Sequence, residues 1–186
     1  MTIFIKNMVC GRCISAVSDI FEKTGIKVKS ISLGEVETES GVSDEDLRTV
    51  EKHLEATGFE RIRDSARQLT EKIKTLIITK ISGLDINENF LLSEFLSAAL
   101  HKDYSSLSKT FSHNETMTLE QFFILQKIEK VKELLLYNES TLTEIAGKLG
   151  YKSVQHLSSQ FRSSTGFTPT EFKKLKIRHR KPLDQV

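Results

Sequence analysis

Hydrophobic positions in the first third of the chain alternate between two periods. Residues 2–6 (Thr-Ile-Phe-Ile-Lys) are rich in β-branched and aromatic side chains, which predicts a short strand. Apolar residues at helical spacing over 13–21 predict a helix, and alternation over 26–33 predicts a second strand. Ser43 can cap a second helix, and residues 59–63 predict a last strand.

These elements follow one another in the order β-α-β-(β)-α-β, which is typical of a ferredoxin-like α+β fold. The stretch 31–43 is short for the central hairpin, so we expect one of its strands to be stunted or missing. From residue 65 onward only helical periodicity is found, and this favours a two-domain chain with an all-α second half. The apolar stripe of the first of these helices consists of Leu69, Ile73, Leu76, Ile77 and Ile81.

The second half contains an internal repeat. Shifting it by 50 residues aligns 92–122 with 142–172 without a gap, and the eight identities exceed the roughly two that chance would supply. The identical pairs are Leu92/Leu142, Glu94/Glu144, Lys102/Lys152, Leu107/Leu157, Ser108/Ser158, Phe111/Phe161, Thr118/Thr168 and Phe122/Phe172. Asp103 also falls on Ser153, and both residue types favour the N-cap position of a helix.

Each copy predicts a helix, a tight turn, a second helix and the start of a third. Such a helix-turn-helix can insert its second helix into the DNA major groove. Residues 118–137 lie between the copies and predict one long helix of about 30 Å. Because one turn of B-DNA is about 34 Å long, this helix could present two recognition helices to successive major grooves.

Residues 87–177 resemble the DNA-binding domain of AraC/XylS-type regulators, which has two helix-turn-helix units bridged by a long helix. The resemblance rests on Ile145-Ala146, Leu149-Gly150-Tyr151, Leu157, Phe161-Arg162, Thr165-Gly166-Phe167-Thr168-Pro169 and Phe172. The first unit departs from the pattern, because Leu100 and Thr116 stand where the second has Gly150 and Gly166. We therefore expect its turn geometry to differ.

The helical phase separates buried positions from candidate DNA contacts. Tyr104, Leu107 and Phe111 are expected to face inward in the first unit, as are Val154, Leu157 and Phe161 in the second. The resemblance implies base contacts at Val154, Gln155 and Ser159, and Arg162 at the flank suits a phosphate. The candidate DNA-binding residues are Ser105, Ser106, Ser108, Lys109, Val154, Gln155, His156, Ser159 and Arg162.

Two cysteines stand between the first strand and the first helix. Cys10 and Cys13 are separated by two residues, so their thiols can close on one soft metal ion, Cu(I) or another thiophilic ion. The helix N-terminus and Arg12 both favour the thiolate form that binds metal.

Residues 1–63 resemble a heavy-metal-associated domain, as found in copper chaperones. The resemblance rests on Met8 two positions before Cys10 and on the pair Gly58-Phe59, while Asn7 replaces a glycine of that family. It implies that both cysteines bind metal and that Met8 packs inward without ligating. A thioredoxin-like redox role and a scaffold that binds nothing remain open alternatives.

Charge divides the chain in the same way. Residues 1–89 carry 13 Lys/Arg against 15 Asp/Glu, and residues 90–186 carry 14 against 10. From Lys148 to Lys181 there are nine basic residues and one acid, which favours a polyanionic partner for the second half. Phosphate contacts are expected from Lys173, Lys174, Lys176, Arg178, Arg180 and Lys181.

The sequence therefore predicts a sequence-specific transcription regulator that binds double-stranded DNA and responds to a soft metal ion. The expected domains are 1–64 (heavy-metal-associated-like), 65–86 (connecting helix), 87–177 (DNA-binding) and 178–186 (basic tail). The alternative is a metal-trafficking protein whose helical half is a docking module. An enzyme is disfavoured, because the sequence has no catalytic triad order, glycine-rich phosphate loop or histidine pair at metal spacing. We expect a cytoplasmic protein without membrane contact, and the N-terminal half is a candidate homodimer contact.

Overall fold

The computed structural model describes residues 1–175. The chain forms two compact units, Met1–Thr75 and Leu76–Val186. The boundary between them falls inside the helix α3 (Ser65–Ser82), which begins at the predicted start of the connecting helix and ends four residues before its predicted end at residue 86. No helix of the described part is both long and apolar enough to span a bilayer.

The first unit is built on a four-stranded antiparallel sheet. Its elements are β1 (Thr2–Lys6), α1 (Gly11–Lys23), β2 (Val28–Ser32), β3 (Glu35–Thr38), α2 (Asp44–Ala56) and β4 (Glu60–Ile62). The strand order is β2-β3-β1-β4, with Ile3 of β1 opposite Val36 of β3 and Ile5 opposite Arg61 of β4. The central hairpin is complete, and its second strand has four residues. Of the two alternatives, a missing strand is not observed, because a two-residue turn at Leu33–Gly34 leaves room for both strands, of five and four residues.

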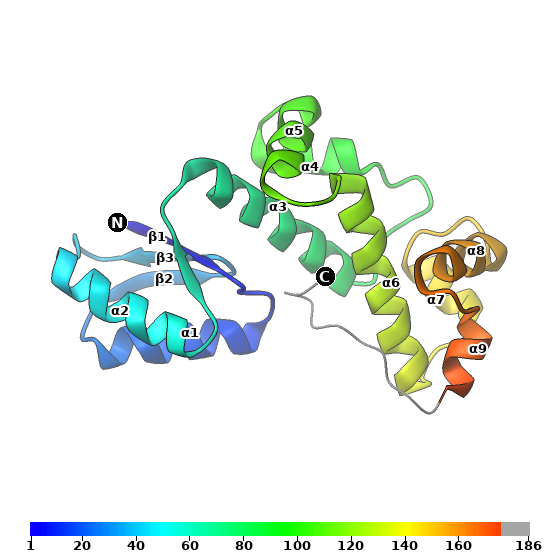
Figure 1. The fold of residues 1–186 in the computed structure, drawn as a ribbon, viewed down its shortest axis with the longest axis horizontal. Coiled ribbons are helices and arrows are strands. Elements are labelled where there is room, and N and C mark those ends of the chain that lie inside the picture. Colours follow the sequence, from blue (N-terminus) through cyan, green and yellow to red (C-terminus); the bar gives the residue numbers. More distant parts are fainter. Residues whose placement is uncertain (176–186) are drawn as a thin grey trace. The chain divides into compact units, whose positions relative to one another are not determined.

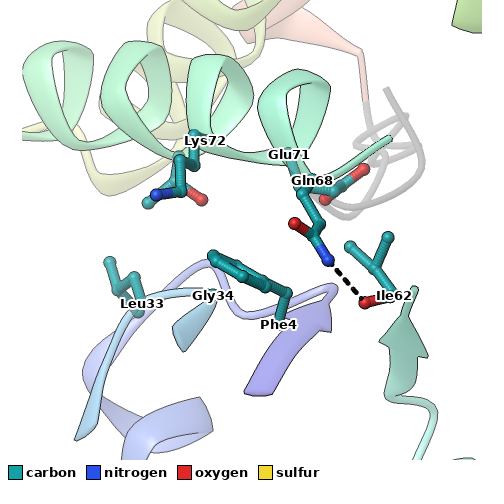
Figure 2. A pocket seen from close by; sticks show the side chains of 8 residues that line it. Phe4, Leu33, Gly34, Ile62, Gln68, Glu71 and Lys72 are labelled. Carbon is teal, nitrogen blue, oxygen red and sulfur yellow. Dashed lines mark hydrogen bonds between the residues drawn. The ribbon is translucent and has the colours of Figure 1, made fainter. Parts of the chain in front are cut away.

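The two faces of this sheet are covered by different helices. α1 and α2 cover one face of the sheet (Figure 1). On that face Ile3 and Ile5 are each 1% exposed and belong to the core shared with the two helices. On the opposite face the Lys72 ammonium lies 4.9 Å from the centroid of the Phe4 ring. Figure 2 shows the small pocket there, where the side-chain amide of Gln68 donates to the Ile62 carbonyl at 3.1 Å. The pocket has room for no more than a water molecule.

The second unit is helical. Its helices are α4 (Leu92–Leu100), α5 (Tyr104–Asn114), α6 (Leu119–Tyr137), α7 (Leu142–Lys148), α8 (Val154–Thr165) and α9 (Pro169–Lys174). The long helix α6 packs against α5 of one short pair, against α8 of the other, and against α9, which follows that second pair (Figure 1). The stripe of α3 is shifted from the prediction. Ile78 is 4% exposed, whereas Leu69 and Leu76 are only half-buried.

The internal repeat extends to side-chain packing. Leu107 and Leu157 are both fully buried, as are Phe111 and Phe161. The ring centroids of Phe111 and Phe122 lie 5.4 Å apart, and those of Phe161 and Phe172, 50 residues later, lie 5.5 Å apart. The predicted helical phase is confirmed at these positions, and α5 and α8 present corresponding faces outward.

The turns of the two copies differ, as expected from Leu100 and Thr116. His101 adopts a left-handed conformation with a φ of 51° after α4, whereas Gly150 does so one repeat position earlier, with a φ of 69°. After α5 the C-cap Glu115 is extended, whereas Gly166 after α8 is left-handed. The first copy therefore reaches the same helix phase through a different backbone path.

Candidate functional site

Both outward-facing helices begin at a side-chain cap. A carboxylate oxygen of Asp103 accepts a hydrogen bond from the Ser106 amide at 2.9 Å. The Ser153 hydroxyl accepts one from the His156 amide at 3.1 Å. The predicted caps are therefore present, and they fix the first turns of α5 and α8 at matching repeat positions.

Most candidate DNA-binding residues lie on the open faces of these two helices. The exposed ones are Ser105, Ser106, Lys109, Gln155, His156, Ser159 and Arg162. Ser108 and Val154 are half-buried. Both lie on the inward-facing side, since residues at spacings of three and four from Leu107, Phe111 and Leu157 share one helix face.

Polar contacts hold each outward helix in place. The Tyr104 hydroxyl of α5 donates to a Glu120 carboxylate oxygen of α6 at 2.5 Å, so this residue is half-buried rather than a core residue. Burial and the Glu120 carboxylate raise the pKa of Tyr104, which stays protonated as a donor. In the second copy the Tyr151 hydroxyl donates to the Gln160 side chain at 2.7 Å, and its ring meets the His156 ring edge-on.

Two lysines beside these faces were not assigned a role from the sequence. Lys102 and Lys152 each precede the N-cap of α5 or α8 by one residue, and both are exposed. Among residues 1–175 neither forms an ion pair. Their identity across the 50-residue repeat is the signal that could have found them.

Of the basic residues near the C-terminal end that are expected to contact phosphates, only Lys173 and Lys174 are described. Lys173 and Lys174 end α9 and are exposed, and the Lys173 ammonium donates to the Asn138 side chain. The expected contacts at Lys176, Arg178, Arg180 and Lys181 lie outside the described residues.

The thiol loop of the first unit is set by Asn7 and Met8. Asn7 has a φ of 71°, a left-handed conformation that glycine and asparagine adopt most readily. Its side-chain amide donates to the Gly58 carbonyl at 2.8 Å, so asparagine can replace a glycine here. Met8 is 2% exposed and lies in the core, as predicted.

Cys10 and Cys13 face each other at the start of α1. Their Sγ atoms lie 3.4 Å apart, with Cys10 exposed and Cys13 half-buried. Partial burial works to raise the pKa of Cys10, but the amide and thiol of Cys13 and the charge of Arg12 outweigh it and lower that pKa. Burial raises the pKa of Cys13. Cys10 is therefore the thiol that ionises first.

The donor set at this loop consists of two thiols. Among residues 1–175 no group of three or more His, Cys, Asp or Glu side chains is placed to hold a metal ion. The sulfur pair fits a soft ion that accepts few ligands, and it does not fit a four-ligand structural zinc site within the described chain.

Comparison with known proteins assigns the second unit. Residues 96–175 match the family model of a helix-turn-helix domain. This helix-turn-helix region contains both outward helices, α5 and α8, and the long helix α6 between them.

Two curated relatives are xylose operon regulatory proteins. The one from Haemophilus influenzae is 31% identical over 74 residues, which is 40% of this chain and 19% of that protein. The one from Escherichia coli K12 is 30% identical over 69 residues, or 37% of this chain and 18% of that protein. The chain thus spans less than a fifth of the length of these relatives.

A solved structure is also similar to the helix-turn-helix region. It is the C-terminal domain of a two-component response regulator from Fusobacterium nucleatum. It is 28% identical, covers 55% of this chain and 99% of its own, and has a TM-score of 0.48.

Proposed function

We propose that this chain is a sequence-specific transcription regulator of the AraC type, which binds double-stranded DNA through two helix-turn-helix units. The observation that carries the proposal is the structural repeat. α5 and α8 begin at side-chain caps in matching repeat positions, bury a leucine and a phenylalanine at matching positions, and have corresponding exposed faces. One helix-turn-helix region with two outward helices suits a partner that repeats along an axis, as DNA does.

The length of α6 supports two simultaneous contacts. Its 19 residues, at about 1.5 Å each, extend for about 28 Å. This approaches the ~34 Å between successive major grooves on one face of B-DNA. α5 packs against α6, and so do α8 and α9. The long helix α6 therefore determines the distance between α5 and α8, the two helices proposed to enter the major groove.

Charge and side-chain chemistry support the assignment of roles. The exposed Gln155 amide offers a donor and an acceptor in one plane, which suits the edge of an adenine. Lys109 and Arg162 flank the two faces and suit phosphates. The named relatives are regulatory proteins of an operon, which agrees with this role for the second unit.

The test is selection of duplexes from a random pool, followed by affinity measurements with a variant. We expect Gln155→Ala to cost about 1–3 kcal/mol on the selected duplex and almost nothing on random DNA. Ser164→Ala is the matched control, because Ser164 is exposed on the same helix but lies about two and a half turns further along, on the opposite side from Gln155. Equal losses on both DNAs would remove the base-contact role, and failure to select any sequence would remove the function.

We also propose that the first unit binds one soft metal ion through Cys10 and Cys13, as in a heavy-metal-associated domain. The 3.4 Å between the two sulfur atoms and the lowered pKa of Cys10 support this second function. Bound there, the ion would be held for sensing or transfer rather than for catalysis. Met8 would support the loop from inside.

Titration of the reduced chain with Cu(I) tests the metal site. The wild type is expected to bind one ion at micromolar levels, and the double variant Cys10→Ser, Cys13→Ser is expected to bind none. Met8→Leu is the control, since an inward-packed methionine that does not ligate can be replaced with the ion still bound. A wild type that binds no thiophilic ion would contradict the assignment.

A further inference from the structure

A segment that precedes the matched helix-turn-helix region reaches the turn of its second helix pair. We call Asp85–Asn87 the strap. The backbone amide of Ile86 donates to the Lys148 carbonyl at 3.2 Å, and Ile86 pairs with Leu149 in an isolated parallel bridge. The strap therefore lies along the end of α7, although more than 60 residues separate the two in sequence.

Gly150 permits this approach. A Cβ atom at Gly150 would lie 2.7 Å from the Asn87 carbonyl oxygen and 2.7 Å from Cγ2 of Ile86. Gly150 also has a φ of 69°, so the position excludes other residues on two grounds. The strap and the turn are in direct backbone contact, and no side chain could be inserted between them without displacing one.

The turn is held from a second side as well. The Lys127 ammonium of α6 donates to the Leu149 carbonyl at 3.3 Å and lies 3.9 Å from the centroid of the Tyr151 ring. The strap and α6 thus bind consecutive carbonyls, those of Lys148 and Leu149. Within residues 1–175 no backbone hydrogen bond from outside its own helix pair reaches the turn between α4 and α5.

The strap is anchored at both of its ends. The Lys80 ammonium of α3 binds the Asp85 carboxylate at 2.9 Å. The Phe90 amide donates to the Asn87 carbonyl at 3.1 Å, and the Phe90 ring stacks on Phe123 of α6. Ile86 itself is 3% exposed. A segment that is fixed at both ends and buried in the middle can hold the turn before α8 in one position, which a mobile linker cannot do.

We propose that the strap is a positioning element for α8, and that it determines the orientation in which the second helix-turn-helix is presented to DNA. The proposal rests on the proposed function and adds Ile86, outside the matched residues 96–175, to the machinery of binding. The first helix pair lacks this clamp in the described chain. Loss of the strap should therefore loosen α8 and leave α5 in place.

Hydrogen exchange of the full chain tests the clamp without DNA. Ile86→Ala should raise amide exchange rates over residues 149–157 at least about 10-fold more than over α5. Leu96→Ala is the matched control, since Leu96 is also buried but belongs to the first helix pair, and it should give the reverse pattern. Ile86→Leu retains the volume but removes the Cγ2 beside Gly150, and it should give a smaller rise in the same segment. Equal rises in both helix pairs would overturn the proposal.

Binding to duplexes that the wild type selects from a random pool supplies the functional readout. Ile86→Ala should bind them about 10-fold more weakly, with an unchanged salt dependence, because phosphate contacts remain while the reading helix is misplaced. If Ile86→Ala binds these duplexes as tightly as the wild type does, the positioning role is wrong. If the wild type selects no duplex, the DNA-binding function fails, and the exchange pattern alone decides whether the strap clamps the turn.

Discussion

Lys127 is a charged residue with only 8% of its surface exposed. Its ammonium contacts the Leu149 carbonyl oxygen and lies over the rings of Tyr151 and Phe123, the latter at 5.1 Å. The carbonyl and the ring faces favour the charged form. Burial works against that form and lowers the pKa of Lys127 to about 8. The residue therefore holds the turn before α8 at a cost in desolvation.

The free energy of unfolding should carry a signature of this lysine. The unfolded chain keeps the proton up to a pKa of 10.5, so between pH 8 and that value it binds more protons than the folded chain. The contribution of Lys127 to stability is therefore lowest below pH 8 and rises with pH. The unfolding free energy of the wild type minus that of Lys127→Met should therefore rise by about 1–3 kcal/mol from pH 7 to pH 10.

Urea unfolding across this pH range measures the difference, and subtraction of the variant removes the titration of all other groups. A difference that does not change with pH would mean that water reaches the ammonium in the folded chain.

Among the elements, α5 and α8 depend on corresponding aromatic anchors. Phe111 and Phe161 are fully buried, and each lies against the phenylalanine of the following helix, Phe122 or Phe172. Each helix buries one leucine besides its ring, Leu107 or Leu157, so the ring is the larger of the two side chains that fix the phase of the helix. Burial of such a ring is among the larger single contributions to stability in a small domain.

Truncation of either ring should therefore be severe. Phe111→Ala and Phe161→Ala should each lower the free energy of unfolding by about 3–5 kcal/mol. Leu107→Ala and Leu157→Ala should cost about 2–5 kcal/mol each. Chemical denaturation is the measurement, with Phe167→Ala as the control, since that ring is 41% exposed and should lose much less. A loss below about 1 kcal/mol at Phe111 or Phe161 would contradict the burial of these rings.

The turns before α5 and α8 give a second prediction at this scale. Lys102 and Lys152 occupy the same repeat position, one residue before the cap of each outward helix. Residues there would stand at the edge of the groove that the helix enters, which is where phosphates lie. We expect Lys102→Gln and Lys152→Gln each to reduce the slope of log affinity against log salt by about one, on any duplex.

Lys23→Gln and Lys52→Gln are the matched controls. Both lysines are exposed in the first unit, and their substitution removes the same charge from a part of the chain with no proposed DNA contact. Equal changes in slope for controls and variants would show that net charge, and not position, decides the salt dependence.

At the scale of the whole molecule, the chain joins an acidic half to a basic one. The formal net charge of +2 conceals an excess of two acids over residues 1–89 and of four bases over residues 90–186. DNA would attract the second half and repel the first. By thermodynamic linkage, an ion bound at the thiol loop can change DNA binding only if two states of the protein bind that ion with different affinity.

This linkage is measurable in the full chain. If the first unit regulates the second, one equivalent of Cu(I) should change the affinity for a selected duplex about 5-fold or more in the wild type. The same addition should leave Cys10→Ser, Cys13→Ser unchanged, with binding measured under reducing conditions. A wild type that binds the ion while its DNA affinity is unmoved would retain the metal site and lose the sensor role.

Local sequence determined much of this structure. The caps at Ser43, Asp103 and Ser153 form where residue type and spacing predict them, because a cap involves only neighbouring residues of the same chain segment. The phase of α5 and α8 also follows from the spacing of their apolar residues. The 50-residue repeat made these predictions stronger, since each copy supports the other.

Only the tertiary structure showed which segments that are far apart in the sequence contact one another. Burial of Gln126, Lys127 and Glu129 on α6 contradicts their polarity, and it follows from neighbours packed around most of that helix. A turn was reason enough to expect a glycine at position 150. The second reason for that glycine is the close approach of Ile86 and Asn87 of the strap, which lie more than 60 positions away. Periodicity reports which face of a helix is buried and not which segment buries it, because apolar packing is non-directional and many partners satisfy the same pattern.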